Sequence, residues 1–191
     1  MVKRWKMGRG VGLAGVFMKS GRNRRRGVSF KKNGLGWVAG ILIFIFSTGS
    51  ALALDPAPVK PSKKDKCPVC GMFVYKYPDW VGEVIFKDGS MAFFDGAKDL
   101  FKYYFNLKKY NAGKTQKDIF AIYVTEYYDL KLMDAHKAFF VMGSDVYGPM
   151  GRELIPFYTK EDAGEFKKDH KGKRILVFKQ ITPAVIRKLD D

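Results

Sequence analysis

Residues 80–107 read WVGEVIFKDGSMAFFDGAKDLFKYYFNL, and this stretch decides the expected fold. Residues 80–86 and 91–94 are apolar runs of strand length, and they flank Lys87-Asp-Gly-Ser90, a strong hairpin turn signal. Asp95 is the expected N-cap of a helix over residues 96–107, whose apolar residues recur every three or four positions. We therefore predict a β-hairpin followed by an amphipathic helix with one core face.

The C-terminal half repeats this order of elements. Strand-like runs cover residues 119–125, 131–133, 137–142, 153–157 and 174–178. A Thr159-to-Asp162 capping box predicts a helix that extends to His170, and Pro183 begins a short C-terminal helix. Residues 108–117 and the glycine-rich residues 143–151 are expected to be loops.

A faint internal similarity relates the two halves. Ala92-Phe-Phe-Asp95 precedes the first helix much as Ile155-Pro-Phe-Tyr-Thr159 precedes the second. We therefore expect an α+β protein of two similar modules, roughly residues 66–117 and 118–191, each a hairpin covered by a helix.

The net charge of +16 is unevenly distributed. Residues 1–53 hold 11 basic and no acidic residues, which leaves 24 basic against 19 acidic residues and a net charge of +5 in the rest. That small excess is typical of a solvated surface, so we expect no nucleic-acid partner.

The basic segment leads into a signal-like sequence. Residues 35–46 are apolar, and the small residues Ala51 and Ala53 follow, which predicts a signal peptide cleaved after Ala53. The alternative is an uncleaved anchor, since the apolar run through Leu54 approaches the roughly 20 residues that span a bilayer. Because no cysteine ends the apolar run, we expect no lipid anchor, and any membrane attachment would be through an uncleaved leader. The leader predicts a periplasmic protein, in a compartment that permits disulfides.

Residues 54–65 are rich in proline and charge and have little to bury, so we expect a flexible linker. The expected domain is residues 66–191.

The domain begins with a cluster of sulfur atoms, Cys67-Pro-Val-Cys-Gly-Met72, which holds both cysteines of the chain. In an exported protein this pair can form a short-loop disulfide that only stabilises the domain, or act in thiol-disulfide exchange. A structural zinc site normally takes four nitrogen or sulfur ligands, and only His136 and His170 remain to complete it. The linker before Cys67 also differs from the strand that precedes a thioredoxin-type motif.

Cu(I) fits this donor set best, because it prefers thiolate and thioether ligands. Cys70 and Met72 would supply two sulfur atoms, and Gly71 between them lets both side chains turn toward one point. Met150 lies between Pro149 and Gly151 and is the expected third donor, although a methionine in such a place can also fill a gap in a core.

The other candidates are weaker. Cys67 is either a fourth ligand or the disulfide partner of Cys70. His170 is either a partner of the helix dipole or a further metal ligand, and His136 is expected at the surface.

Several separated motifs together resemble the NosL family of accessory copper-binding proteins for nitrous oxide reductase. The motifs are Cys67-Pro-Val-Cys-Gly-Met-Phe-Val74, Lys87-Asp-Gly89, Phe93-Phe-Asp-Gly96 with Asp99 and Tyr103, and Gly143-Ser-Asp-Val-Tyr-Gly-Pro-Met-Gly151 with Pro156-Phe157. The resemblance covers most of residues 66–182 and implies two related ββαβ modules. It also implies that Cys70, Met72 and Met150 bind one Cu(I), with His170 as a secondary candidate.

The function that this resemblance implies is delivery of copper, without catalysis. The expected recipients are an ABC-type maturation complex or the apo-reductase in the periplasm. The sequence lacks the lipoprotein cysteine of many relatives. We therefore expect no lipid anchor that would support docking on a membrane transporter.

Overall fold

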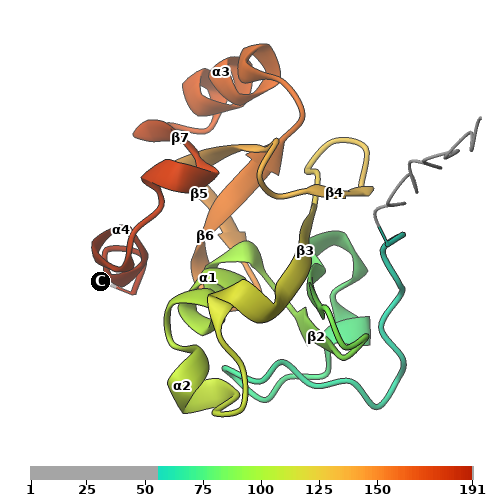
Figure 1. Cartoon of the computed structure of the whole chain (residues 1–191). Helices are drawn as coiled ribbons and strands as arrows, with labels where there is room; N and C mark the ends of the chain where they lie inside the picture. The colour runs from blue at the N-terminus through green and yellow to red at the C-terminus, as the bar shows by residue number, and fades with distance from the viewer. Residues whose placement is uncertain (1–55, 191) are drawn as a thin grey trace, which may run out of the picture. The chain divides into compact units, whose positions relative to one another are not determined.

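The computed structural model describes residues 56–190 (Figure 1). The predicted leader and its cleavage site lie outside the described residues. Within residues 56–190, no helix is both long enough and apolar enough to cross a membrane.

The first module contains the predicted hairpin and helix. Its elements are β1 (Gly82–Phe86), β2 (Met91–Phe94), α1 (Ala97–Phe105), the short α2 (Leu107–Tyr110), β3 (Ile119–Thr125) and β4 (Leu132–Asp134). β1 pairs antiparallel with both β2 and β3, and β4 adds to β3, so the strand order is β2-β1-β3-β4. The expected loop over 108–117 is partly wrong, because α2 occupies its first residues.

The second module repeats the first. Its elements are β5 (Phe139–Gly148), β6 (Gly151–Phe157), α3 (Lys160–Asp169), β7 (Arg174–Val177) and the terminal α4 (Pro183–Arg187). The strand order β6-β5-β7 matches β2-β1-β3 of the first sheet, and both sheets are antiparallel. The prediction of two ββαβ modules is therefore confirmed.

Sheet pairing moves the boundary between the modules. β3 and β4 belong to the first sheet, so this sheet extends to Asp134 and beyond the expected boundary at residues 117 and 118. Because β3 must return beside β1 to complete the ββαβ unit, the boundary falls between β4 and β5.

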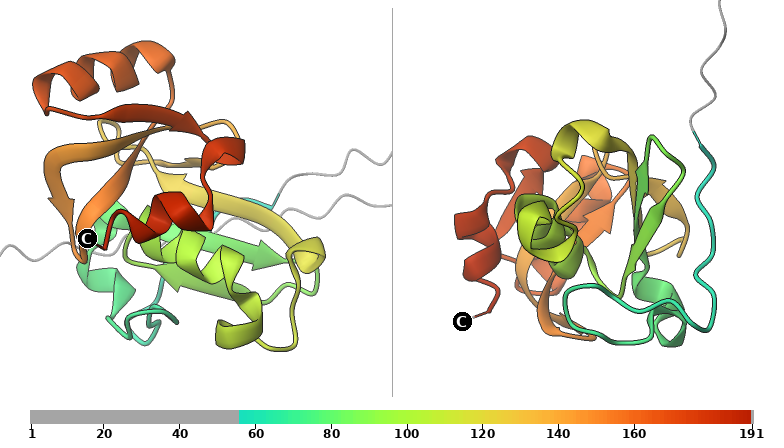
Figure 2. Two further views of the ribbon diagram at one scale, coloured as in Figure 1. Left: turned by 90° about the vertical axis from the view of Figure 1, so that its left-hand side faces the viewer. Right: turned by 60° about the horizontal axis from the view of Figure 1, so that its bottom comes forward.

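α1 lies between the two sheets (Figure 2). Leu100 is fully buried and packs with Gly82 and Phe94 of the first sheet. Phe101 packs edge-on against Phe140 of the second sheet, with ring centroids 5.5 Å apart. Because α1 packs against strands of both sheets, this helix holds the modules together.

α3 covers the other face of the second sheet (Figure 1). Phe166 of α3 is fully buried and packs on Phe157 of β6, with ring centroids 4.9 Å apart. Thr159 caps this helix as predicted, since its Oγ1 accepts a hydrogen bond from the Asp162 N–H at 3.0 Å. α3 and its core are therefore on the side of the second sheet opposite to α1.

The expected loop over residues 143–151 is wrong. β5 continues to Gly148 and β6 begins at Gly151, so only Pro149 and Met150 lie between them. The pairing shifts its register between Met142 and Tyr147, and Gly143 has a φ of 79° there. Glycine tolerates this left-handed conformation, so the strand bends without ending.

The expected flexible linker is an extended segment attached to the first sheet. The Val59 N–H donates to Glu83 Oε2 at 3.0 Å, and the Tyr123 hydroxyl donates to the Pro56 carbonyl at 2.5 Å. The proline and charged residues predicted a segment without helix or strand. The composition did not predict its attachment to the sheet, which depends on buried Glu83 of β1 as a hydrogen-bond acceptor.

Candidate metal centre

Residues 67–72 form a closed loop, which we call the sulfur loop. The Cys67 N–H donates to the Met72 carbonyl and the Gly71 N–H donates to the Cys67 carbonyl, both at 2.9 Å. Lys66 and Phe73 pair as an antiparallel bridge at the base of the loop. Gly71 has a φ of 80°, so a residue without a Cβ is needed at this turn.

Two carboxylates at the start of α1 face the sulfur loop. Cys70 Sγ lies 3.2 Å from Asp95 Oδ1, and Cys67 Sγ lies 3.6 Å from Asp99 Oδ2. Both cysteines are free thiols, so each S–H can donate to a carboxylate. Asp95 precedes the N-cap Gly96 and Asp99 is in the first turn of α1, so both carboxylates lie at the start of this helix.

The predicted N-cap role of Asp95 is wrong. The N-cap of α1 is Gly96, which makes no side-chain capping bond. The Asp95 carboxylate accepts the Cys70 thiol, and the Lys98 N–H of the first helical turn donates to Glu153 of β6. A residue from the second module therefore satisfies the start of the helix.

Burial keeps both thiols protonated. Cys67 is 1% exposed, and its burial raises the pKa of its thiol far above the usual range, with Asp95 adding to the effect. Burial, together with the hydrogen bond and charge of Asp95, raises the pKa of the half-buried Cys70 thiol to about 12. The pKa of Asp99 is raised too, mainly by burial.

The four side chains have the spacing of a metal site. One ligand atom from each of Cys67, Cys70, Asp95 and Asp99 lies within 4.8 Å of the other three. Metal bonds of about 2.0–2.3 Å place the donors of a tetrahedral ion roughly 3.3–3.8 Å apart, so small movements are enough to bind one. The carboxylates suit a divalent ion, whereas Cu(I) prefers the sulfur atoms.

The two predicted thioether ligands differ in their surroundings. Met72 is half-buried at the end of the sulfur loop, and Met150 is 41% exposed in the turn between β5 and β6. The Met150 carbonyl accepts a hydrogen bond from Lys98 Nζ at 2.7 Å, which attaches this turn to the same helix start as Asp95 and Asp99. The fold therefore brings the Met150 turn to α1, although this methionine is 78 residues after Met72 in the sequence.

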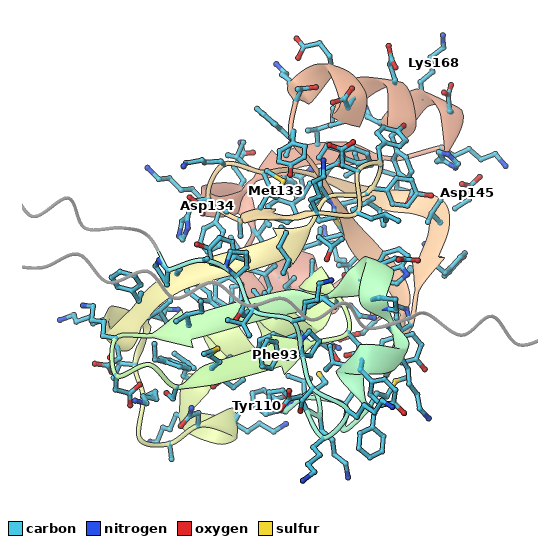
Figure 3. All side chains as sticks on the ribbon, turned by 90° about the vertical axis from the view of Figure 1, so that its right-hand side faces the viewer. Phe93, Tyr110, Met133, Asp134, Asp145 and Lys168 are labelled. Atoms are coloured by element: carbon cyan, nitrogen blue, oxygen red, sulfur yellow. The ribbon has the colours of Figure 1, made fainter. Side chains whose placement is uncertain are left out.

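His170 is placed apart from these residues. It follows α3, stacks on Phe166 with ring centroids 4.3 Å apart, and its Nδ1 lies 3.3 Å from Asp145 Oδ1. Figure 3 shows Asp145 at the α3 end of the described region, well away from Phe93 and Tyr110. Those two residues line a hollow with Pro68 of the sulfur loop, so His170 is at the opposite end from the thiols.

His136 is at the surface, as predicted. Its side chain is 53% exposed, its Nδ1 lies 3.1 Å from Asp134 Oδ1, and its ring stacks on Phe178.

The sequence did not reveal the roles of four polar residues near the start of α1. Asp95 and Asp99 could have been noticed because two carboxyl residues lie at the start of a helix that the sequence predicts. No local signal marks Lys98 and Glu153, because their contact joins residues 55 positions apart.

The profile of the NosL family matches residues 58–186, about two-thirds of the chain. The chain belongs to the NosL family.

Two relatives support this membership. A copper-binding lipoprotein NosL from Stutzerimonas stutzeri is 30% identical over 131 residues, which cover 68% of each chain. The crystal structure of the copper chaperone NosL from Shewanella denitrificans is similar with a TM-score of 0.58 and 26% identity. That similarity covers 69% of this chain and 98% of the other, so this NosL chain shares the fold across the described modules.

Proposed function

We propose that this protein is a Cu(I) metallochaperone of the periplasm, without enzymatic activity. The observation that carries the proposal is the pair of free thiols, Cys67 and Cys70, presented by a sulfur loop next to two carboxylates. The NosL relatives named as copper-binding and as a copper chaperone support the choice of metal. The cargo in this proposal is one Cu(I) ion.

Cys70, Met72 and Met150 are the proposed ligands, with Cys67 as a fourth. Cu(I) carries one charge and prefers sulfur, so four anionic donors would leave a large uncompensated negative charge. In our proposal the carboxylates accept protons from the thiols, because a thiol must lose its proton when it binds a metal. Asp95 and Asp99 lie at hydrogen-bond distance from the two sulfur atoms, and the raised pKa of Asp99 suits it to hold a proton.

The proposed recipient is an ABC-type maturation complex or apo-nitrous oxide reductase, or another exported copper enzyme. Exposed Met150 and half-buried Cys70 are accessible to a recipient, whereas Cys67 is not. Ligand exchange would thus begin at the exposed thioether and end at the buried thiol. Export is supported by the predicted leader and by the lipoprotein nature of the Stutzerimonas relative.

The alternative of thiol-disulfide exchange has less support from the site. An attacking thiol works best with a pKa near the ambient pH. Burial raises the pKa of Cys70 to about 12 and that of Cys67 further, so both thiols are poor nucleophiles without a metal.

Anaerobic titration of the reduced protein with Cu(I), against a competing chelator, tests the proposal. We expect one tightly bound ion, a large loss of affinity in Cys70→Ser, and a smaller loss in the Met72→Ala/Met150→Ala double variant. Met91→Ala is the matched control, because Met91 is also exposed, at 45%, and lies outside the proposed ligand set. Wild-type affinity in the double methionine variant would refute the thioether ligands.

A further inference from the structure

The turn that carries Met150 is fastened to α1 by a buried lysine. Lys98 is 3% exposed, and its Nζ donates to the Met150 carbonyl at 2.7 Å. The same Nζ lies 3.4 Å from Asp190 Oδ1, which is its ion-pair partner. An ammonium group is costly to bury unless it is paired, so this lysine holds the turn through a strong, charge-assisted bond.

A buried glutamate of β6, the strand that follows the Met150 turn, binds the same turn of α1. Glu153 of β6 is 2% exposed, and its Oε1 accepts the Lys98 N–H at 2.5 Å and the Leu154 N–H at 2.8 Å. Gly96 and Gly148 lie against its carboxylate and its side chain, where a Cβ would clash or crowd. Two glycines and two backbone donors thus define one position for this side chain.

The start of α1, with Asp95 just before the helix, therefore contacts both parts of the proposed copper site. Asp95 and Asp99 accept from the thiols of the sulfur loop, while Lys98 between them holds the Met150 turn. The Met150 side chain is 41% exposed, so packing alone does little to place its sulfur. Its position depends on the backbone, and hence on the Lys98 bond.

We propose that Lys98 and Glu153 are positioning residues, which hold the Met150 turn where its sulfur and that of Cys70 can bind one ion. The inference rests on the proposed function, because it assumes that Met150 is a ligand. Residues that orient metal ligands commonly change metal affinity by about 10–100-fold when they are replaced. Preorganisation is the physical reason, since a turn that is already in place loses less entropy on binding.

The test is a double-mutant cycle with Cu(I) affinity as the readout. Lys98→Met keeps the length of the side chain and removes the donor, and we expect it to weaken Cu(I) binding by at least about tenfold. In a Met150→Ala background the same substitution should have no further effect, because the ligand that Lys98 places is gone.

The single variants separate the inference from the proposed function. If Met150→Ala binds Cu(I) as tightly as wild type, the ligand assignment itself fails. If Met150→Ala weakens binding and Lys98→Met does not, or if Lys98→Met has its full effect in both backgrounds, only the positioning inference is overturned.

Two further variants control for charge and shape. Asp190→Asn removes the charge of the other partner of Lys98 but keeps an oxygen that can accept from its Nζ, and the Met150 carbonyl stays bonded, so we expect wild-type affinity. Glu153→Gln keeps an oxygen that can accept the Lys98 N–H and should retain affinity, whereas Glu153→Leu should lose about as much as Lys98→Met. Loss of affinity in Asp190→Asn, or full affinity in Glu153→Leu, would contradict the inference.

One measurement needs no variant and covers the case in which Lys98→Met does not fold. The backbone N–H of Met150 in the metal-free protein should have an NMR order parameter near that of a rigid backbone, about 0.85. A value below about 0.6 would show that the turn is not held before the metal binds, and would overturn the inference.

Discussion

Cys70 Sγ lies 3.2 Å from Asp95 Oδ1 and 3.4 Å from Asp95 Oδ2. A thiol this close to a carboxylate donates a hydrogen bond to it and keeps its proton, because a thiolate would be repelled by the carboxylate charge. The same carboxylate can accept the proton when a metal binds. One contact thereby keeps Cys70 unreactive in the metal-free protein, and in the proposed function it also provides an acceptor for the proton that the thiol loses to a metal.

Asp95→Asn should make Cys70 more reactive. Removing the charge lowers the pKa of the thiol, although burial, the larger cause, remains. We expect alkylation by iodoacetamide near pH 8 to become several-fold faster, since the thiolate is the reacting form. Rates followed by mass spectrometry check this.

Asp88→Asn is the control for this alkylation experiment. Asp88 lies in the exposed turn of the first hairpin and pairs with Lys114. Equal rates in Asp95→Asn and wild type would refute the role assigned to the Asp95 carboxylate.

Glu153 should make stability fall as the pH rises. Burial raises the pKa of Glu153 from an ordinary value of 4.5 to about 8. Between these values the folded state binds a proton that the unfolded state has released, so the free energy of unfolding falls by up to about 1.4 kcal/mol per pH unit. The stabilisation is complete below pH 4.5 and lost above about pH 8.

Urea unfolding of wild type and Glu153→Gln between pH 5 and pH 9 measures this effect. The variant cannot titrate at this position, so its stability should decline less steeply than that of wild type. The comparison cancels the contributions of other carboxyl groups, including Asp99, whose pKa is also raised. Parallel pH profiles for the two proteins would contradict the assignment.

Gly96→Ala should destabilise the fold. A Cβ at this position would collide with Glu153 Oε2, and the two backbone donors to Oε1 restrict movement of that carboxylate. Inserting a methyl group into a filled space typically costs about 1–3 kcal/mol. Chemical denaturation gives the free energy of unfolding.

Gly113→Ala is the matched control, because an added Cβ there would meet nothing within 4 Å. It should change stability by less than about 0.5 kcal/mol. Similar losses in the two variants would show that the effect of Gly96→Ala is not caused by contact with Glu153.

His170→Ala should leave Cu(I) affinity unchanged. The imidazole stacks on Phe166 and lies beside Asp145, at the α3 end of the fold. Loss of the stacked pair should cost about 0.5–1.5 kcal/mol of stability. Chelator competition and thermal unfolding measure the two effects separately, and a weaker affinity for Cu(I) would restore His170 as a ligand candidate.

The two hairpin-and-helix modules could be predicted from local patterns of residues. Apolar periodicity and the turn at Lys87-Asp-Gly-Ser90 are local signals, and the structure confirms both hairpins and both covering helices. The prediction from local signals was wrong where a glycine is typical both of a loop and of a bend within a strand. Gly143 looked like part of a loop, yet its positive φ allows a bend within β5.

The surroundings of the sulfur loop depend on long-range packing, and local patterns did not predict them. Asp95 looked like a helix cap, and it is a thiol partner because Glu153 of the other module satisfies the helix start. Lys98 reaches Met150 across 52 positions of sequence because the second sheet packs on α1. Such contacts depend on how two modules meet, which no local pattern of residues records.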